Sequence, residues 1–138
     1  MIGAVAMAVA AGALIGLSRQ VNGRLALARG ALGASFWNHL VGALALLVAA
    51  LAFPPDLSAL REVPGWAWLG GPLGVLFVAA GSWLVARIGA ARTALLVIAG
   101  QMVTGALLDT LRLGWDGGAL RALGVAVIVA GVWLAAER

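Results

Sequence analysis

The chain has 138 residues, 64% of them hydrophobic and only 10% charged, with a net charge of +4. A soluble domain carries about 25% charged residues because its surface faces water, so this composition excludes an ordinary soluble fold and favours a chain surrounded by lipid. The lack of cysteine excludes disulfides, thiolate metal sites and cysteine nucleophiles, and the single histidine excludes a multi-histidine metal cluster within one chain.

Five apolar segments follow one another along the chain and account for nearly all of it. Each comes close to the roughly 20 helical residues that cross a bilayer core about 30 Å thick. The first lacks a basic leading region, so we expect a retained membrane helix rather than a cleaved signal peptide. The sequence predicts an all-α integral membrane protein, a single domain over residues 1–138 with helices at about residues 2–28, 33–53, 66–87, 93–113 and 119–136.

The tryptophans and arginines gather near the ends of these segments. Five of the six tryptophans lie close to a predicted helix end, which is typical of an aromatic belt at the membrane interface. All the basic residues are arginines, and their spread fits membrane anchoring rather than nucleic-acid binding. The positive-inside rule favours an outside N-terminus by a margin of only about two or three arginines, and so weak a bias permits insertion in both orientations.

Three of the predicted helices carry ridges of small residues spaced four apart. Such ridges let helices pack closely in a membrane, and we interpret them mainly as helix-packing positions. The ridge of the first helix contains Gly12, Gly16 and Gln20, that of the third Gly70 and Gly74, and that of the fourth Gln101, Gly105 and Asp109.

Polar side chains inside the apolar runs allow two interpretations. The amides of Gln20, Asn22, Asn38 and Gln101 either form hydrogen bonds between helices or line a wet cavity. His39, about two turns inside the second helix, is either a protonation switch or a satisfied core group.

Asp109 is the acidic residue with the strongest claim to a role. A carboxylate in a membrane helix is costly and usually marks a pathway, a proton relay or a counter-ion. Its place near the helix end leaves two other interpretations open, contact with interfacial water or an ion pair with Arg112 three residues on.

No motif of a known catalytic site is present. The sequence lacks G-x-S-x-G, H-E-x-x-H, paired carboxylates and a phosphate-binding glycine loop. We therefore predict no enzyme activity, no cofactor, no metal site and no nucleic-acid partner.

An ordered set of residues resembles the YdcZ-like proteins, a five-helix, half-size branch of the drug/metabolite transporter superfamily. The resemblance covers nearly the whole chain, and His39 departs from it, since an apolar or small residue is expected there. The matching residues are Gln20, Asn22, Leu25, Ser35, Phe36, Gly42, the GGPLG run from Gly70 to Gly74, Gly89 and Ala90 in RIGAA, and the GQ and Asp109 of GQMVTGALLD.

The resemblance implies a multi-pass protein of the bacterial inner membrane that exports small molecules. Larger members have ten helices in two inverted five-helix repeats, with the substrate site at the repeat interface. A five-helix chain is then half of such a transporter and needs an antiparallel partner, a second copy or an oppositely inserted paralogue. The first helix lacks the glutamate of the four-helix multidrug exporters, which favours a neutral, zwitterionic or anionic solute over a cationic drug.

The sequence thus predicts an exporter that works by alternating access as an antiparallel dimer. The alternatives are a non-transporting assembly or regulatory subunit and a flippase of a lipid-linked substrate. The residues expected to line the cavity are Gln20, Asn22, Trp37, Asn38, His39, Gln101 and Asp109.

Overall fold

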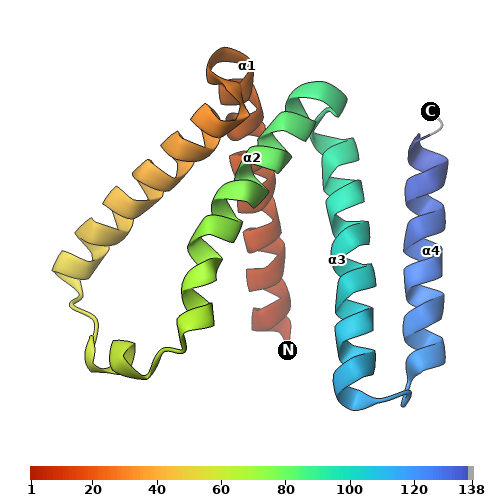
Figure 1. Cartoon of the computed structure of the whole chain (residues 1–138). Helices are drawn as coiled ribbons and strands as arrows, with labels where there is room; N and C mark the ends of the chain where they lie inside the picture. Colours follow the sequence, from red (N-terminus) through yellow and green to blue (C-terminus); the bar gives the residue numbers. More distant parts are fainter. Residues whose placement is uncertain (137–138) are drawn as a thin grey trace. The chain divides into compact units, whose positions relative to one another are not determined.

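The computed structural model describes residues 1–136, which form α-helices and short 3-10 helices and, within that range, no strand (Figure 1). Four of the helices are long and apolar enough to cross a membrane, which agrees with the predicted membrane class. The elements in chain order are α1 (Ile2–Ala52), η1 (Ser58–Glu62), η2 (Gly65–Leu69), α2 (Gly70–Ile88), α3 (Ala90–Leu113) and α4 (Gly118–Ala136).

The prediction of five separate helices is wrong in number, because the first two predicted spans form one helical element, α1, which is interrupted only at Gly30, a residue with non-helical backbone angles. This helix, α1, is sharply bent at Gly30, whose backbone has φ 74° and ψ 165°. The first arm of α1 (residues 2–29) and its second arm (residues 31–52) run in different directions from that bend (Figure 1). The predicted spans of residues 2–28 and 33–53 lie on the two arms, with no loop between them.

Glycine is required at the bend because a Cβ atom makes this backbone conformation costly. Gly89, between α2 and α3, has nearly the same conformation, with φ 83° and ψ 165°. Helical structure resumes directly after each of these glycines. A single residue therefore redirects the chain at both places, and almost the whole sequence remains helical.

The chain divides into two compact units, Met1–Arg87 (unit 1) and Ile88–Arg138 (unit 2). Unit 1 contains α1, η1, η2 and α2, and unit 2 contains α3 and α4. Each unit has its own group of polar side chains between helices.

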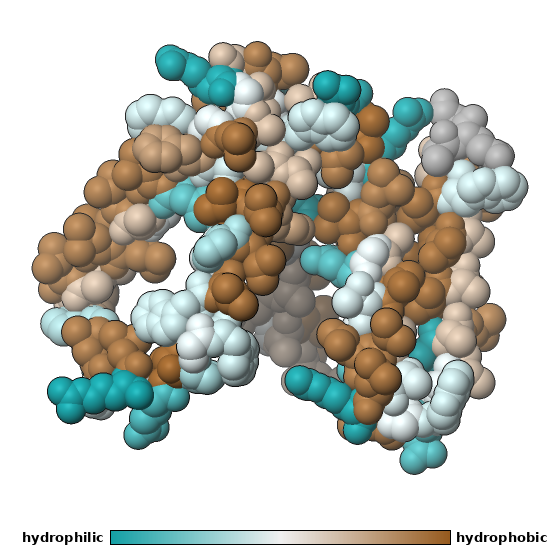
Figure 2. All heavy atoms as spheres, in the orientation of Figure 1, coloured by the Kyte–Doolittle hydropathy of each residue, from teal (hydrophilic) through white to brown (hydrophobic). Residues whose placement is uncertain are grey.

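Unit 1 buries small and polar residues and exposes large apolar ones. Asn22, Ser35 and Ser82 are buried, and the apolar residues buried with them in this unit are Ala34, Ala79 and Val85. Most of the leucines and other large apolar residues are exposed, and Figure 2 shows them as brown surfaces along the helices. A soluble protein has the opposite distribution, so lipid must solvate the outer surface.

The segment between the second arm of α1 and α2 is polar and carries exposed aromatic side chains. The backbone N–H of Ser58 donates to the Asp56 carboxylate at 2.9 Å, and this bond together with the Ser58 side chain lowers the pKa of Asp56. Trp66 and Trp68 of η2 are exposed. An amphipathic aromatic ring next to charged loop residues is typical of the membrane–water interface.

The tightest helix contact in unit 1 lies where the first arm of α1 meets α2. A Cβ atom on Gly23 would overlap the side chain of Val85. We therefore predict that Gly23→Ala lowers the free energy of unfolding by about 1–3 kcal/mol, the usual cost of overpacking. The measurement is reversible unfolding in mixed detergent micelles.

Gly42→Ala is the matched control, because a Cβ atom there meets nothing within 4 Å. It should leave stability unchanged or raise it by up to about 1 kcal/mol through helix propensity. The double variant Gly23→Ala/Val85→Ala should recover most of the loss. Equal stability of Gly23→Ala and Gly42→Ala would contradict the contact.

Candidate functional site

The two arms of α1 are joined by a hydrogen bond between two amide side chains. Asn22 Nδ2 donates to Asn38 Oδ1 at 2.8 Å and lies 3.3 Å from Ser18 Oγ. Asn22 is only 8% exposed. Asn22 and Asn38 therefore form the hydrogen bond between helical segments that was one of their two predicted roles. The bond also brings together two of the residues expected to line a cavity.

His39 lies one turn after Ser35 and is held by the backbone of that residue. Its Nδ1 is 2.8 Å from the Ser35 carbonyl oxygen, which can only accept, so Nδ1 carries the hydrogen of this bond. The Ser35 hydroxyl donates to the carbonyl oxygen of Val75 on α2 at 2.9 Å. The second arm of α1 is thereby tied to α2 through a buried serine.

The other ring nitrogen of His39 faces Gly74. A Cβ atom on Gly74 would lie 3.4 Å from His39 Nε2. When the imidazole is neutral and Nδ1 carries the hydrogen, Nε2 is an acceptor. Gly74, predicted as a helix-packing residue, thus makes room for a histidine ring, and the polar cluster of unit 1 comprises Ser18, Asn22, Ser35, Asn38 and His39.

Two predicted cavity residues of unit 1 lie apart from this cluster. Gln20 is exposed and makes no side-chain hydrogen bond among residues 1–136. Trp37 is 46% exposed and packs edge-to-face on Phe36, with ring centroids 5.7 Å apart. Neither side chain bonds to the polar cluster, so any cavity role for them depends on surfaces outside unit 1.

Unit 2 contains a groove of about 550 Å³ between α3 and α4. Gln101, Gly105 and Asp109 line its α3 side, as expected for residues four apart on one helical face. The α4 side is formed by glycines and apolar residues together with one arginine. The full lining is Gln101, Met102, Gly105, Ala106, Asp109, Gly117, Leu120, Arg121, Gly124 and Val125.

Arg121 is a site residue that the sequence analysis missed. It follows the glycine-rich turn of residues 114–118 and was counted with the arginines near helix ends. In the structure it lies inside the first turn of α4 and lines the groove. Its Nη1 donates to Thr110 Oγ1 at 3.4 Å and its Nη2 donates to the backbone carbonyl of Asp116. The one sequence feature that could have indicated this role is the position of Arg121 in the first turn of the helix that follows the glycine-rich turn.

The predicted alternative of an ion pair between Asp109 and Arg112 is not formed. Among residues 1–136, no arginine nitrogen lies within 4.0 Å of an Asp109 carboxylate oxygen. Groups of three or more metal-ligating side chains are likewise not found in the described part of the chain. Asp109 thus lines the groove without a counter-charge from its own helix.

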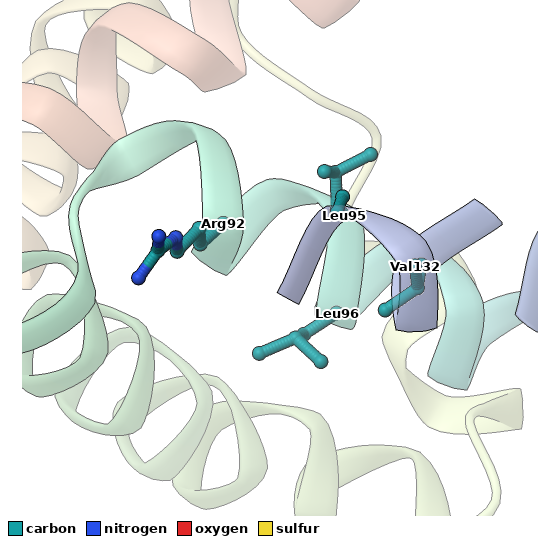
Figure 3. A pocket seen from close by; sticks show the side chains of 5 residues that line it. Arg92, Leu95, Leu96 and Val132 are labelled. Carbon is teal, nitrogen blue, oxygen red and sulfur yellow. The ribbon is translucent and has the colours of Figure 1, made fainter. Parts of the chain in front are cut away.

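A second hollow between α3 and α4 is small and apolar. It holds about 30 Å³ and is lined by Arg92, Leu95, Leu96, Val132 and Ala135. In Figure 3 the Arg92 guanidinium points away from Leu95, Leu96 and Val132. This volume suits no more than one or two waters, so we assign it no binding role.

Comparison with known proteins agrees with a membrane class built from long apolar helices. Residues 3–134 match the model of a family described as "Putative inner membrane exporter, YdcZ". The chain is 36% identical over 110 residues to the inner membrane protein YdcZ of Escherichia coli strain K12, covering 73% of this chain and 72% of that protein. No solved structure matches.

The helices and these comparisons define a multi-pass protein of the bacterial inner membrane, from a family described as inner membrane exporters. The chain belongs to the YdcZ family, as its ordered motifs predicted.

The Asn22–Asn38 bond predicts an energetic coupling between the arms of α1. The variants Asn22→Ala and Asn38→Ala and their double variant should give a coupling energy of about 0.6–1.7 kcal/mol, the range measured for hydrogen bonds between membrane helices. The measurement is a double-mutant cycle on unfolding in mixed micelles. Gln20→Ala with Asn38→Ala is the control pair and should be additive, because Gln20 does not bond to Asn38. Additivity of the Asn22 and Asn38 changes would refute the bond.

Proposed function

We propose that this protein exports a small molecule by alternating access as an antiparallel dimer with a second copy of itself. The observation that carries the proposal is the groove of unit 2, where Gln101 and Asp109 lie inside a predicted membrane span and line a volume of about 550 Å³. Ligand sites in proteins typically occupy about 300–1,000 Å³ and combine apolar walls with a few polar groups. Membership of an exporter family supports the same conclusion.

The unfilled small-residue ridges support a partner. A Cβ atom on Gly12, Gly16, Gly70 or Gly105 would meet nothing within 4 Å. These glycines were expected to pack against other helices, and among the described residues of their own unit nothing occupies the space beside them. Small-residue ridges let membrane helices approach closely, so they are suited to contact with a second copy.

An antiparallel arrangement is the one that produces a transporter from half-size chains. Inverted repeats place a substrate site near the middle of the membrane, at the interface of the two halves. In such a dimer each groove, with its Asp109, is present twice and in opposite orientation.

The test is a comparison of solutes released by living cells. Cells producing equal amounts of the wild-type protein or Asp109→Asn would be fed uniformly ¹³C-labelled glucose, and labelled solutes in the medium would be compared. At least one solute should be released by the wild type and reduced about tenfold or more by Asp109→Asn, since hydrogen bonds to a charged group contribute about 1.5–3 kcal/mol.

Glu62→Gln is the matched control, because Glu62 is an exposed loop carboxylate outside the groove. It should release the same solutes as the wild type. Indistinguishable media from wild type, Asp109→Asn and cells without the protein would contradict export and favour an assembly or regulatory subunit. A difference confined to lipid-linked material would instead indicate a flippase.

A further inference from the structure

Two opposite charges line the groove of unit 2, and they do not neutralise each other. Asp109 comes from α3 and Arg121 from α4. No ion pair within 4.0 Å joins them. In a membrane span, uncompensated charges are costly and are usually retained for a function.

Arg121 is held in place by neutral groups. Its guanidinium donates to Thr110 Oγ1 and to the backbone carbonyl of Asp116. The Thr110 hydroxyl donates its own hydrogen to the Ala106 carbonyl at 2.8 Å, so its oxygen is available to accept from Arg121. A guanidinium has five N–H donors, and these contacts leave donors available for an anion in the groove.

A ligand with a single charge would satisfy only one side of this arrangement. A cation bound at Asp109 would leave Arg121 without a counter-ion, and an anion bound at Arg121 would leave Asp109 without one. A small zwitterion neutralises both charges at once. Because a charge that is removed from water without being paired is costly, the groove should favour the zwitterion over both singly charged forms.

The rest of the groove suits an apolar tail. Met102, Leu120 and Val125 line it, and Gly105 and Gly124 leave it hollow. Gln101 is eight residues from Asp109, or about 12 Å along the helix axis. The charged end and the amide end of the groove are thus separated by an apolar stretch, and Gln101 lies too far away to help bind a compact charged head group.

We propose that this groove binds an amino-acid-like zwitterion with an apolar side chain, its ammonium group at Asp109 and its carboxylate at Arg121. The conclusion that such a zwitterion is the exported solute rests on the proposed export function. The conclusion that the groove binds it does not. Arg121 is then a substrate-binding residue.

The experiment is competition binding on the purified full-length protein in lipid nanodiscs, with radiolabelled leucine as the probe. The competitors are leucine, its methyl ester, which keeps only the positive charge, N-acetylleucine, which keeps only the negative charge, and glycine, which lacks the tail. Leucine should compete at concentrations at least about tenfold lower than any of the other three, as expected from one charge-assisted hydrogen bond.

Two variants should change this order in opposite directions. Asp109→Asn should weaken the binding of leucine and raise the affinity for N-acetylleucine relative to that for leucine. Arg121→Gln should also weaken the binding of leucine, but it should raise the affinity for the methyl ester relative to that for leucine. Arg121→Lys, which retains the charge, should keep the wild-type order. Because each comparison is a ratio within one variant, partial loss of folded protein cannot imitate the reversal.

Failure of this proposal is distinguishable from failure of the export function. Absence of leucine binding, equal competition by the singly charged analogues, or an unchanged order in both charge-removing variants would overturn the zwitterion site. If the medium comparison still finds a solute that depends on Asp109, export stands with another substrate class. If leucine binds in the predicted order but no solute depends on the protein in cells, the binding site stands and export falls.

Discussion

Every polar side chain on a membrane helix must find a partner, because lipid offers no hydrogen bonds in place of water. The buried polar side chains of unit 1 meet this requirement internally, whereas the exposed Gln20 makes no side-chain hydrogen bond among residues 1–136. Asn22 bonds to Asn38, His39 bonds to the Ser35 backbone, and Ser35 bonds to Val75 on α2. These bonds connect the first arm of α1, its second arm and α2. The bend at Gly30 makes the connection geometrically available, since it allows two arms of one helix to pair their amides.

Unit 2 meets the same requirement only in part, and the candidate site lies where it is incomplete. Thr93 and Thr110 donate their hydroxyl hydrogens to backbone carbonyls of their own helix. Arg121 is satisfied by neutral acceptors, whereas Asp109 has no arginine within ion-pair distance in the described part of the chain. The groove is therefore lined by one carboxylate and one guanidinium that are not paired within 4.0 Å, which gives it a dipolar character. The proposed binding of a zwitterion follows from that electrostatic arrangement.

Hydropathy was sufficient to predict the membrane class, and an ordered set of motif residues predicted the family, because these depend on composition and spacing along the chain. Hydropathy predicted a break near Gly30. It did not predict that helical structure resumes directly after this residue, because that depends on the backbone conformation of Gly30. The amides were predicted either to bond between helices or to line a cavity, but the partner of Asn22 could not be deduced, because it lies sixteen residues away across the bend. Arg121 was missed because an arginine near a helix end has the same sequence pattern as a membrane anchor.

The antiparallel dimer can be tested most directly by the orientation of the chain in the membrane. The sequence has no cysteine, so one cysteine added after Arg138 gives a single reporter for a thiol reagent that cannot cross the membrane. In intact cells about half of the protein should react, because an inverted pair of identical chains needs both orientations. Reaction of all or none of the protein would show one fixed orientation and contradict an antiparallel dimer of this chain.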